Sequence, residues 1–149
     1  MTQLAMHSPV GDLTISEDEG AIVSVDWGWG AVQAETPLLL EAKRQLERYF
    51  DGDLKQFDLP LRPYGTTFRQ QVWATMTRIP YGSTQTYGKI AAAVGSTARA
   101  VGGACGANPI PIIIPCHRVL AAGGGLGGYS GDGGTETKVF LLRLEGALL

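Results

Sequence analysis

A chain of 149 residues is long enough to bury about two-thirds of its unfolded surface in one or two compact domains. With 44% hydrophobic and 17% charged residues, it has the composition of a soluble globular protein. No apolar run approaches the roughly 20 residues of a membrane span. The N-terminus lacks a charged stretch followed by an apolar one, so we expect no signal peptide, no membrane association and a cytoplasmic location.

The chain has only two cysteines, Cys105 and Cys116, and two histidines, His7 and His117. So few cysteines, in a chain without signs of secretion, argue against a disulfide framework. The spacing of these residues does not match a zinc site either. We therefore expect no metal and no cofactor.

The net charge of −2 hides a strong asymmetry along the sequence. Residues 1–60 carry four Lys and Arg against 11 Asp and Glu, whereas residues 61–149 carry eight against three. This distribution suggests that the C-terminal part meets a polyanion, although a random spread of surface charge would also produce it.

Residues 1–60 are predicted to form a small N-terminal α/β domain. Short apolar stretches alternate with turn signals over residues 2–30, and residues 21–27 alternate apolar and polar side chains as a half-buried strand does. A helix is predicted to begin at Thr36-Pro37, an N-cap followed by a first-turn proline, and to end at Gly52.

Residues 61–149 are predicted to form a mostly helical second domain. One helix is expected over residues 66–77, and two shorter helices over residues 86–94 and 97–105, with Gly95-Ser96 between them. Two short helices around a turn that contains glycine are typical of a helix-turn-helix.

The last of these helices consists almost entirely of Ala and Gly around Arg99. Glycine costs about 1 kcal/mol relative to alanine inside a helix. The pair Gly102-Gly103 therefore requires a reason, which is either close approach of the helix backbone to something large or tight packing against another helix.

The most informative segment is residues 112–119, where an apolar, strand-like run ends in Pro115, Cys116, His117 and Arg118. Three consecutive isoleucines resist χ1 rotation and the proline fixes its own φ, so this segment is expected to be stiff. A thiol on a stiff base is expected to be a positioned nucleophile. Considered alone, however, a cysteine of this kind is more often a buried structural residue.

Several motifs of residues 61–149 follow one another in the order found in one known family. They are Phe68–Trp73, Ile79–Gly82, Thr86–Ala91, Arg99–Ala104, Asn108-Pro109, Ile114–Val119, Gly128–Gly131 and Lys138–Gly146. By these motifs the chain strongly resembles the O6-alkylguanine-DNA alkyltransferases, repair proteins that move an alkyl group from guanine to a cysteine. Residues 1–60 resemble, more loosely, the ribonuclease-H-like N-terminal domain of that family.

The resemblance implies a reaction and the residues that perform it. An alkyl group, such as methyl, would pass irreversibly from O6-alkylguanine, and also from O4-alkylthymine, to Cys116 in a single turnover. His117 and Glu145 would act with a bridging water to deprotonate the thiol. Tyr87 would push on a phosphate and donate a proton to the leaving oxygen, and Asn108 would brace the turn before the cysteine.

The resemblance also implies how double-stranded DNA is bound. The second helix of the helix-turn-helix would enter the minor groove, and the damaged base would be flipped out of the stack. The residues expected to contact DNA are Tyr87, Thr97, Arg99, Ala100, Gly102 and Gly103, with Arg99 filling the vacated place in the stack. Those expected to form the base pocket are Arg118, Val119, Tyr129, Ser130 and Gly131. The protein is expected to act as a monomer.

Three features depart from the family pattern. Asp132-Gly133-Gly134 stands where a shorter turn with an apolar residue is usual, which puts the tolerance for large alkyl groups in question. Cys105 stands where Met is common, and the N-terminal part is short.

Three other interpretations compete with alkyl transfer. A non-catalytic relative would lack the nucleophilic cysteine. A helix-turn-helix regulator would carry polar base-reading side chains on its second helix. A cysteine hydrolase would turn over and would normally take its base from a distant segment.

Overall fold

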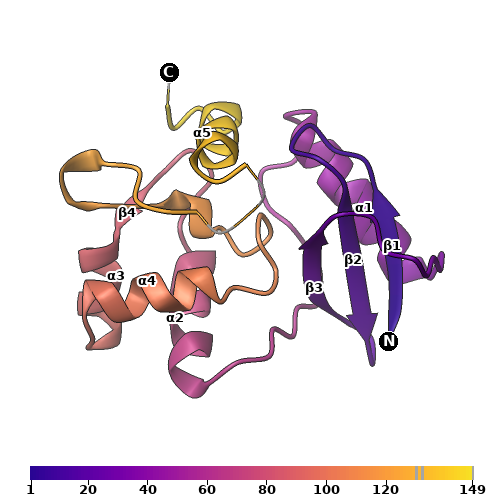
Figure 1. Cartoon of the computed structure of the whole chain (residues 1–149), viewed down its shortest axis with the longest axis horizontal. Coiled ribbons are helices and arrows are strands. Elements are labelled where there is room, and N and C mark those ends of the chain that lie inside the picture. Colours follow the sequence, from indigo (N-terminus) through magenta and orange to yellow (C-terminus); the bar gives the residue numbers. More distant parts are fainter. Residues whose placement is uncertain (130, 132, 149) are drawn as a thin grey trace. The chain divides into compact units, whose positions relative to one another are not determined.

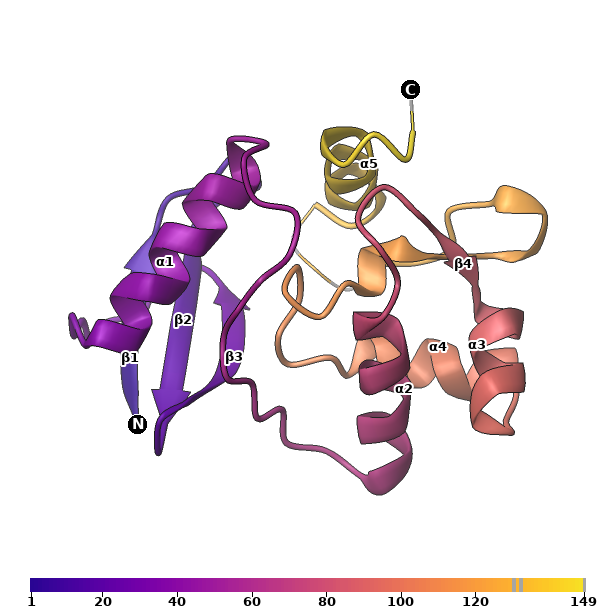
Figure 2. The same ribbon diagram turned by 180° about the vertical axis from the view of Figure 1, so that it is seen from behind.

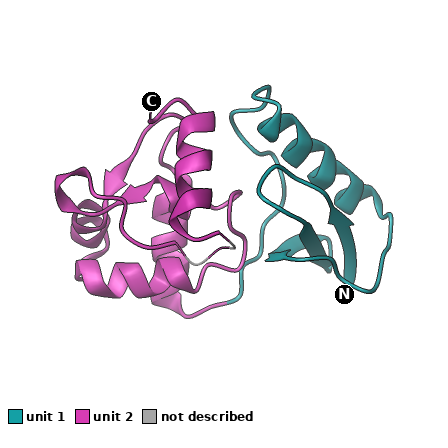
Figure 3. Ribbon diagram, turned by 45° about the horizontal axis from the view of Figure 1, so that its top comes forward, with its two compact units in different colours: residues 1–64 teal, residues 65–149 magenta. Residues whose placement is uncertain are grey.

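The computed structural model describes residues 1–129, 131 and 133–148 (Figure 1). The chain divides into two compact units, residues 1–64 and residues 65–149 (Figure 3). The last residues of the first unit are joined to its sheet, because Leu61 bridges to Ile22 and the backbone N–H of Arg62 donates to the Ile22 carbonyl at 2.8 Å. Residues 61–64, which the sequence placed with the helical domain, therefore belong to the first compact unit.

The first unit contains one antiparallel sheet in the order β1-β2-β3. Its strands are β1 (Thr2–Met6), β2 (Leu13–Asp18) and β3 (Ala21–Trp27). Leu4, Ile15 and Val25 are aligned across the three strands and are buried, as the alternating pattern of β3 predicts.

Helix α1 (Pro37–Phe50) lies across one face of this sheet (Figures 1 and 2). It begins as predicted, with the Thr36 hydroxyl accepting a hydrogen bond from the backbone of Leu39 at 3.1 Å and a proline in the first turn. Leu39, Leu46 and Tyr49 recur at helical spacing and are fully buried. They form the core of the unit together with the apolar side chains of the sheet.

In its described residues, the second unit is built mainly from four helices. They are α2 (Thr67–Thr77), α3 (Tyr87–Val94), α4 (Ala98–Gly106) and α5 (Thr135–Leu144). Two short parallel strands, β4 (Gln85–Thr86) and β5 (Val119–Leu120), and two 3₁₀ turns, η1 (Cys116–Arg118) and η2 (Ala122–Gly124), complete it.

The predicted helix-turn-helix is present as α3 and α4. Thr86 and Thr97 cap the two helices through their hydroxyls, and Gly95 ends α3 in the left-handed conformation at φ +67°. Helix α2 packs against both, and the indole N–H of Trp73 donates to the Ala104 carbonyl of α4 at 2.8 Å. This buried bond fixes the last turn of α4, close to where the chain turns toward Cys116.

The segment before Cys116 is not the strand that its isoleucines suggest. Residues 110–114 form a turn in which the N–H of Ile114 donates to the Ile110 carbonyl at 2.9 Å. Ile112 has φ +73°, a left-handed conformation that is costly for a β-branched side chain. Burial of the isoleucines outweighs the local β preference here, so the segment is compact and not extended.

Across the described parts of the chain, no helix combines the length and the apolar character needed to cross a membrane.

Candidate active site

Cys116 opens the 3₁₀ turn η1 and is almost completely buried, with 6% of its surface exposed. Its position is set by Asn108, whose side-chain N–H donates to the Ile114 carbonyl at 2.9 Å. The Asn108 carbonyl oxygen accepts from the backbone of Ile110 at 2.9 Å. One amide therefore holds both ends of the turn that precedes the cysteine.

The surroundings of Cys116 act on its pKa in opposite directions. Burial raises the pKa of the thiol, whereas a hydrogen bond from the Asn108 side chain and the positive charge of Lys138 lower it. Burial is the largest of these effects, so the resting sulfur is a neutral thiol. A nucleophilic thiolate at this position then needs a base to take its proton.

The fully buried carboxylate of Glu145 contacts both residues that follow the cysteine in the chain. Oε2 of Glu145 is 2.7 Å from Nε2 of His117. The guanidinium of Arg118 binds both oxygens of the same carboxylate, at 2.8 and 3.0 Å, and donates to the Ile79 carbonyl at 2.7 Å. Such a bidentate pair keeps Glu145 ionised and fixed in orientation.

This arrangement determines which ring nitrogen of His117 carries the proton. An ionised carboxylate only accepts hydrogen bonds, so Nε2 of His117 must be the donor to Glu145. Burial lowers the pKa of His117 and Glu145 opposes that shift, so the neutral ring is favoured. Nδ1 is then an unprotonated acceptor, and within the described residues it has no hydrogen-bond partner. His117 is thus available as a base.

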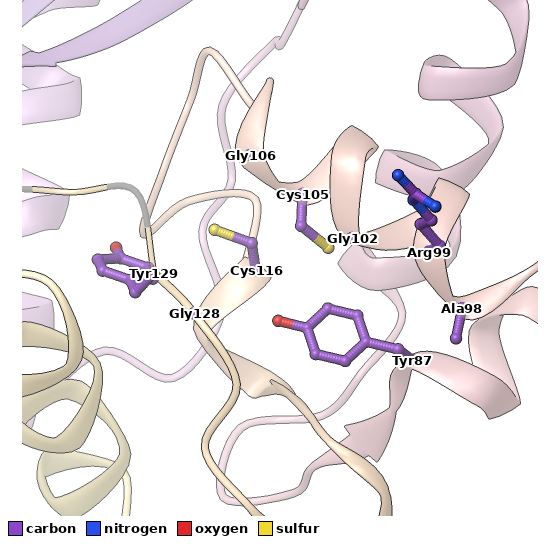
Figure 4. Close-up of a pocket in the computed structure, with 9 residues that line it drawn as sticks. All are labelled: Tyr87, Ala98, Arg99, Gly102, Cys105, Gly106, Cys116, Gly128 and Tyr129. Atoms are coloured by element: carbon purple, nitrogen blue, oxygen red, sulfur yellow. The ribbon is translucent and has the colours of Figure 1, made fainter.

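Cys116 lies in a pocket of about 610 Å³. The pocket is lined by Tyr87, Ala98, Arg99, Gly102, Cys105, Gly106, Cys116, Gly128 and Tyr129. Figure 4 shows the Tyr87 phenol pointing from α3 toward Cys116, with Arg99 and Tyr129 at opposite ends of the pocket. The helix-turn-helix, the cysteine and the glycine-rich loop of residues 121–134 therefore share one cavity.

Both tyrosines of the pocket remain protonated at neutral pH. Burial, together with the neighbouring cysteines, raises the pKa of Tyr87 to about 12. Burial also raises the pKa of Tyr129, and Cys116 adds to the shift. Each phenol can therefore donate a hydrogen bond to a group that enters the pocket.

The outer surface of α4 is made of small residues. A Cβ atom added to Gly102 or Gly103 would meet no atom within 4 Å in the described protein. The tight helix packing that could have required these glycines is therefore ruled out as their reason. Ala100 is half-buried and Thr97 is exposed as the N-cap of the helix, while Arg99 projects at the pocket.

Two residues expected to form the base pocket lie elsewhere. The guanidinium of Arg118 is held by Glu145 and Ile79, because a buried cation requires such partners. Val119 is fully buried in β5, and of the described residues neither it nor Arg118 lines the cavity. Gly131 follows Tyr129 in the loop outside that lining, and Ser130 and Asp132 lie outside the described residues.

Sequence reasoning missed two residues of the site. Lys138 was noted only as part of a motif, yet its side chain is fully buried and donates to the Val119 carbonyl at 2.7 Å. Cys105 lines the pocket, and its thiol lies 3.4 Å from the sulfur of Met76. A lysine at a helical position with apolar neighbours is the signal that could have identified the first.

The described residues contain no cluster of three or more His, Cys, Asp or Glu side chains that could hold a metal ion.

Comparison with known proteins gives matches over both units. Residues 2–63 match the family described as 6-O-methylguanine DNA methyltransferase, ribonuclease-like domain. Residues 67–147 match the family described as 6-O-methylguanine DNA methyltransferase, DNA binding domain. The mixed α/β class and the ribonuclease-like first domain predicted from the sequence are confirmed.

Relatives match over nearly the whole chain. A methylated-DNA–protein-cysteine methyltransferase of Methanosarcina acetivorans is 45% identical over 151 residues, covering 95% of this chain and 96% of that protein. The constitutive methylated-DNA–protein-cysteine methyltransferase of Bacillus subtilis is 46% identical, covering 93% and 92%. The crystal structure of Mycobacterium tuberculosis OGT in complex with DNA matches with a TM-score of 0.88 at 39% identity, covering 99% of this chain and 94% of that one. The chain therefore belongs to the 6-O-methylguanine DNA methyltransferase family.

Proposed function

We propose that this protein repairs DNA by moving the methyl group of O6-methylguanine to its own Cys116. The observation that carries the proposal is a cysteine in a pocket lined by a helix-turn-helix, followed in the chain by His117, whose ring is paired with the buried Glu145. Family membership supports the same reaction. The finer features expected from the sequence belong to the proposal: base flipping, action on O4-alkylthymine, a monomeric protein and a cytoplasmic location.

The reaction begins with the proton of Cys116. A water bridging to Nδ1 of His117 takes this proton, and Glu145 stabilises the imidazolium that forms. The sulfur then attacks the methyl carbon, so that an S–C bond forms as the C–O6 bond breaks. The electron pair of the broken bond stays on the guanine, which gains a proton through the Tyr87 hydroxyl, while His117 gives up to water the proton that it took from Cys116. The DNA then carries the normal base.

Tyr87 is proposed to assist the leaving group. Its phenol points toward the sulfur, and its pKa of about 12 keeps it protonated, so it can donate a hydrogen bond to O6 as negative charge develops there. The product is a thioether on Cys116. Hydrolysis of a thioether would need a strongly activated water, so the cysteine is used once.

The small residues of α4 support entry into the minor groove. The open space around Gly102 and Gly103 would let sugar–phosphate walls approach the helix backbone, and Arg99 at the pocket mouth could fill the place of a flipped base. We also propose DNA contacts for Thr97 and Ala100, and a pocket wall on which the base stacks for Tyr129.

Mass spectrometry of the intact protein after incubation with duplex DNA containing O6-methylguanine tests the proposal. We expect one methyl group per molecule, located on Cys116 and limited to a single turnover, and none in Cys116→Ala, which should still bind the duplex. Unmodified wild-type protein that binds the duplex would instead support the non-catalytic interpretation. Repeated turnover would support a hydrolase, and tight sequence-specific binding of undamaged DNA would support a regulator.

A further inference from the structure

One buried cation in the second unit has no part in the relay of Cys116, His117 and Glu145. Lys138 lies in the first half of α5, and its side chain is completely inaccessible. A buried lysine is costly unless its ammonium is fully paired. The hydrogen-bond partners of the Lys138 ammonium therefore show which segments of the chain this side chain holds in place.

Within the described residues, the hydrogen-bond partners of this ammonium are all backbone carbonyls. Nζ donates to Val119 of β5 at 2.7 Å, to Gly128 of the glycine-rich loop at 3.2 Å, and to Leu126. An ammonium has three N–H donors, so three carbonyls satisfy the protonated form and leave a neutral amine one donor short. Lys138 thus joins the glycine-rich loop to β5, the strand that directly follows the 3₁₀ turn of Cys116.

The same loop segment carries a close contact with Tyr87. Gly127, between two residues that Lys138 binds, has φ +67°, and a Cβ atom there would lie 2.9 Å from the Tyr87 ring and 3.1 Å from its hydroxyl. Nζ of Lys138 lies 5.7 Å from the centre of that ring. The loop, the lysine and the phenol therefore pack as one unit at the edge of the pocket.

We infer that Lys138 is a positioning residue for methyl transfer, which holds residues 126–128 against Tyr87 and places a fixed positive charge in the wall of the pocket that contains Cys116. This inference rests on the proposed function. The loop forms the pocket wall through Gly128 and Tyr129, so its position sets where the base and the Tyr87 hydroxyl meet the sulfur.

The charge of Lys138 acts on a defined group of neighbours. Burial lowers its own pKa, and the thiols of Cys116 and Cys105 oppose that shift when ionised. In return Lys138 lowers the pKa of both thiols. The other groups that face Cys116 are Asn108, whose hydrogen bond also lowers the thiol pKa, and the protonated phenols of Tyr87 and Tyr129.

Lys138→Met tests the inference, because methionine keeps much of the side-chain volume and removes both the charge and the donors. Arg143→Met is the matched control, since it removes the same charge from an exposed position of the same helix.

In Lys138→Met we expect faster amide hydrogen exchange over residues 121–131. We also expect the pH profile of iodoacetamide labelling at Cys116, followed on its peptide, to move up by about one pH unit. Methyl transfer should slow on the order of 100-fold, as expected when reacting groups are misplaced by about 1 Å.

A folded Lys138→Met protein with the wild-type labelling profile and transfer rate would overturn the inference. If Lys138→Met does not fold, Gly127→Ala tests the inference instead. The Cβ atom of the new alanine would push the loop away from Tyr87 while leaving the lysine side chain unchanged. It should slow transfer and leave the Cys116 labelling profile unchanged, whereas Gly125→Ala, at φ −64° with only an ordinary contact, should change neither. A wild-type transfer rate in Gly127→Ala would then overturn the inference.

The two proposals fail separately. If the wild-type protein takes no methyl group from DNA, the proposed function is wrong, and hydrogen exchange and iodoacetamide labelling still decide the role of Lys138.

Discussion

Oε2 of Glu145 lies 2.7 Å from Nε2 of His117, and both side chains are completely buried. The same carboxylate binds Arg118 through both oxygens, so one acid serves as partner to two consecutive residues. The ion pair fixes the carboxylate, and the carboxylate fixes the imidazole. The base next to Cys116 is thereby oriented without any direct contact with solvent.

Loss of the Glu145 charge should therefore affect both stability and reactivity. Glu145→Gln leaves the buried guanidinium of Arg118 without its counter-charge, and breaking a buried pair in this way costs about 3–5 kcal/mol of unfolding free energy. Urea denaturation measures this cost, and the rate of methyl transfer should fall as well. Glu136→Gln removes a charge from the exposed first turn of α5 and should change neither quantity. Equal stability of the two variants would contradict the assigned ion pair.

The lowered pKa of His117 predicts a pH dependence of stability. The folded protein holds the ring neutral below the ordinary pKa of 6.5, whereas the unfolded chain takes up a proton there. The contribution of His117 to unfolding free energy is thus complete above about pH 6.5 and is lost as the pH falls toward the folded pKa. Urea denaturation between pH 7.5 and pH 5 should show this loss, and His117→Gln should show a shallower slope. An identical slope in the variant would contradict the prediction.

Asn108 should be needed for both the turn and the thiol. Asn108→Ala leaves the Ile110 N–H without its partner, which costs about 1–3 kcal/mol for an unsatisfied buried group. It also removes one of the two donors to the Ile114 carbonyl, which keeps the hydrogen bond from the Cys116 N–H at 2.8 Å. Asn108→Asp keeps the acceptor for Ile110, but it removes the donor and places a negative charge near Cys116. Iodoacetamide labelling of Cys116 should therefore require higher pH in Asn108→Asp than in the wild type. A labelling profile at or below the wild-type pH would show that Asn108 does not act on the thiol.

Substitutions at the two glycines of α4 that face open space, Gly102 and Gly103, should affect DNA binding without impairing folding. Gly103→Ala meets no protein atom and improves helix propensity, so unfolding free energy should rise by up to about 1 kcal/mol. Gly103→Leu should fold equally well but should weaken binding of duplex DNA, measured by fluorescence anisotropy, because its side chain occupies the space proposed for the groove wall. Gly88→Leu on α3 controls for bulk on a helix surface. Unchanged duplex affinity in Gly103→Leu would place the DNA on another surface.

The sequence by itself determined the helices and much of the chemistry. Threonine caps, a first-turn proline and terminal glycines act within three or four residues, so the bounds of α1, α2, α3 and α4 could be predicted closely. The Cys116-His117 pair, and the ordered motifs around it, pointed to the family in the same local way.

Only the tertiary structure decided how buried charges are used. Arg118 was expected in the base pocket, but its guanidinium is bound by the buried carboxylate of Glu145, 27 residues along the chain, and does not line that pocket. The isoleucines before Cys116 read locally as a strand, yet burial and the Asn108 side chain fold them into a turn. The role inferred for Lys138 depends on hydrogen bonds from its ammonium to three backbone carbonyls, which lie 10 to 19 residues away in the sequence. A buried charge must be paired wherever partners lie in space, and no local pattern of residues contains that information.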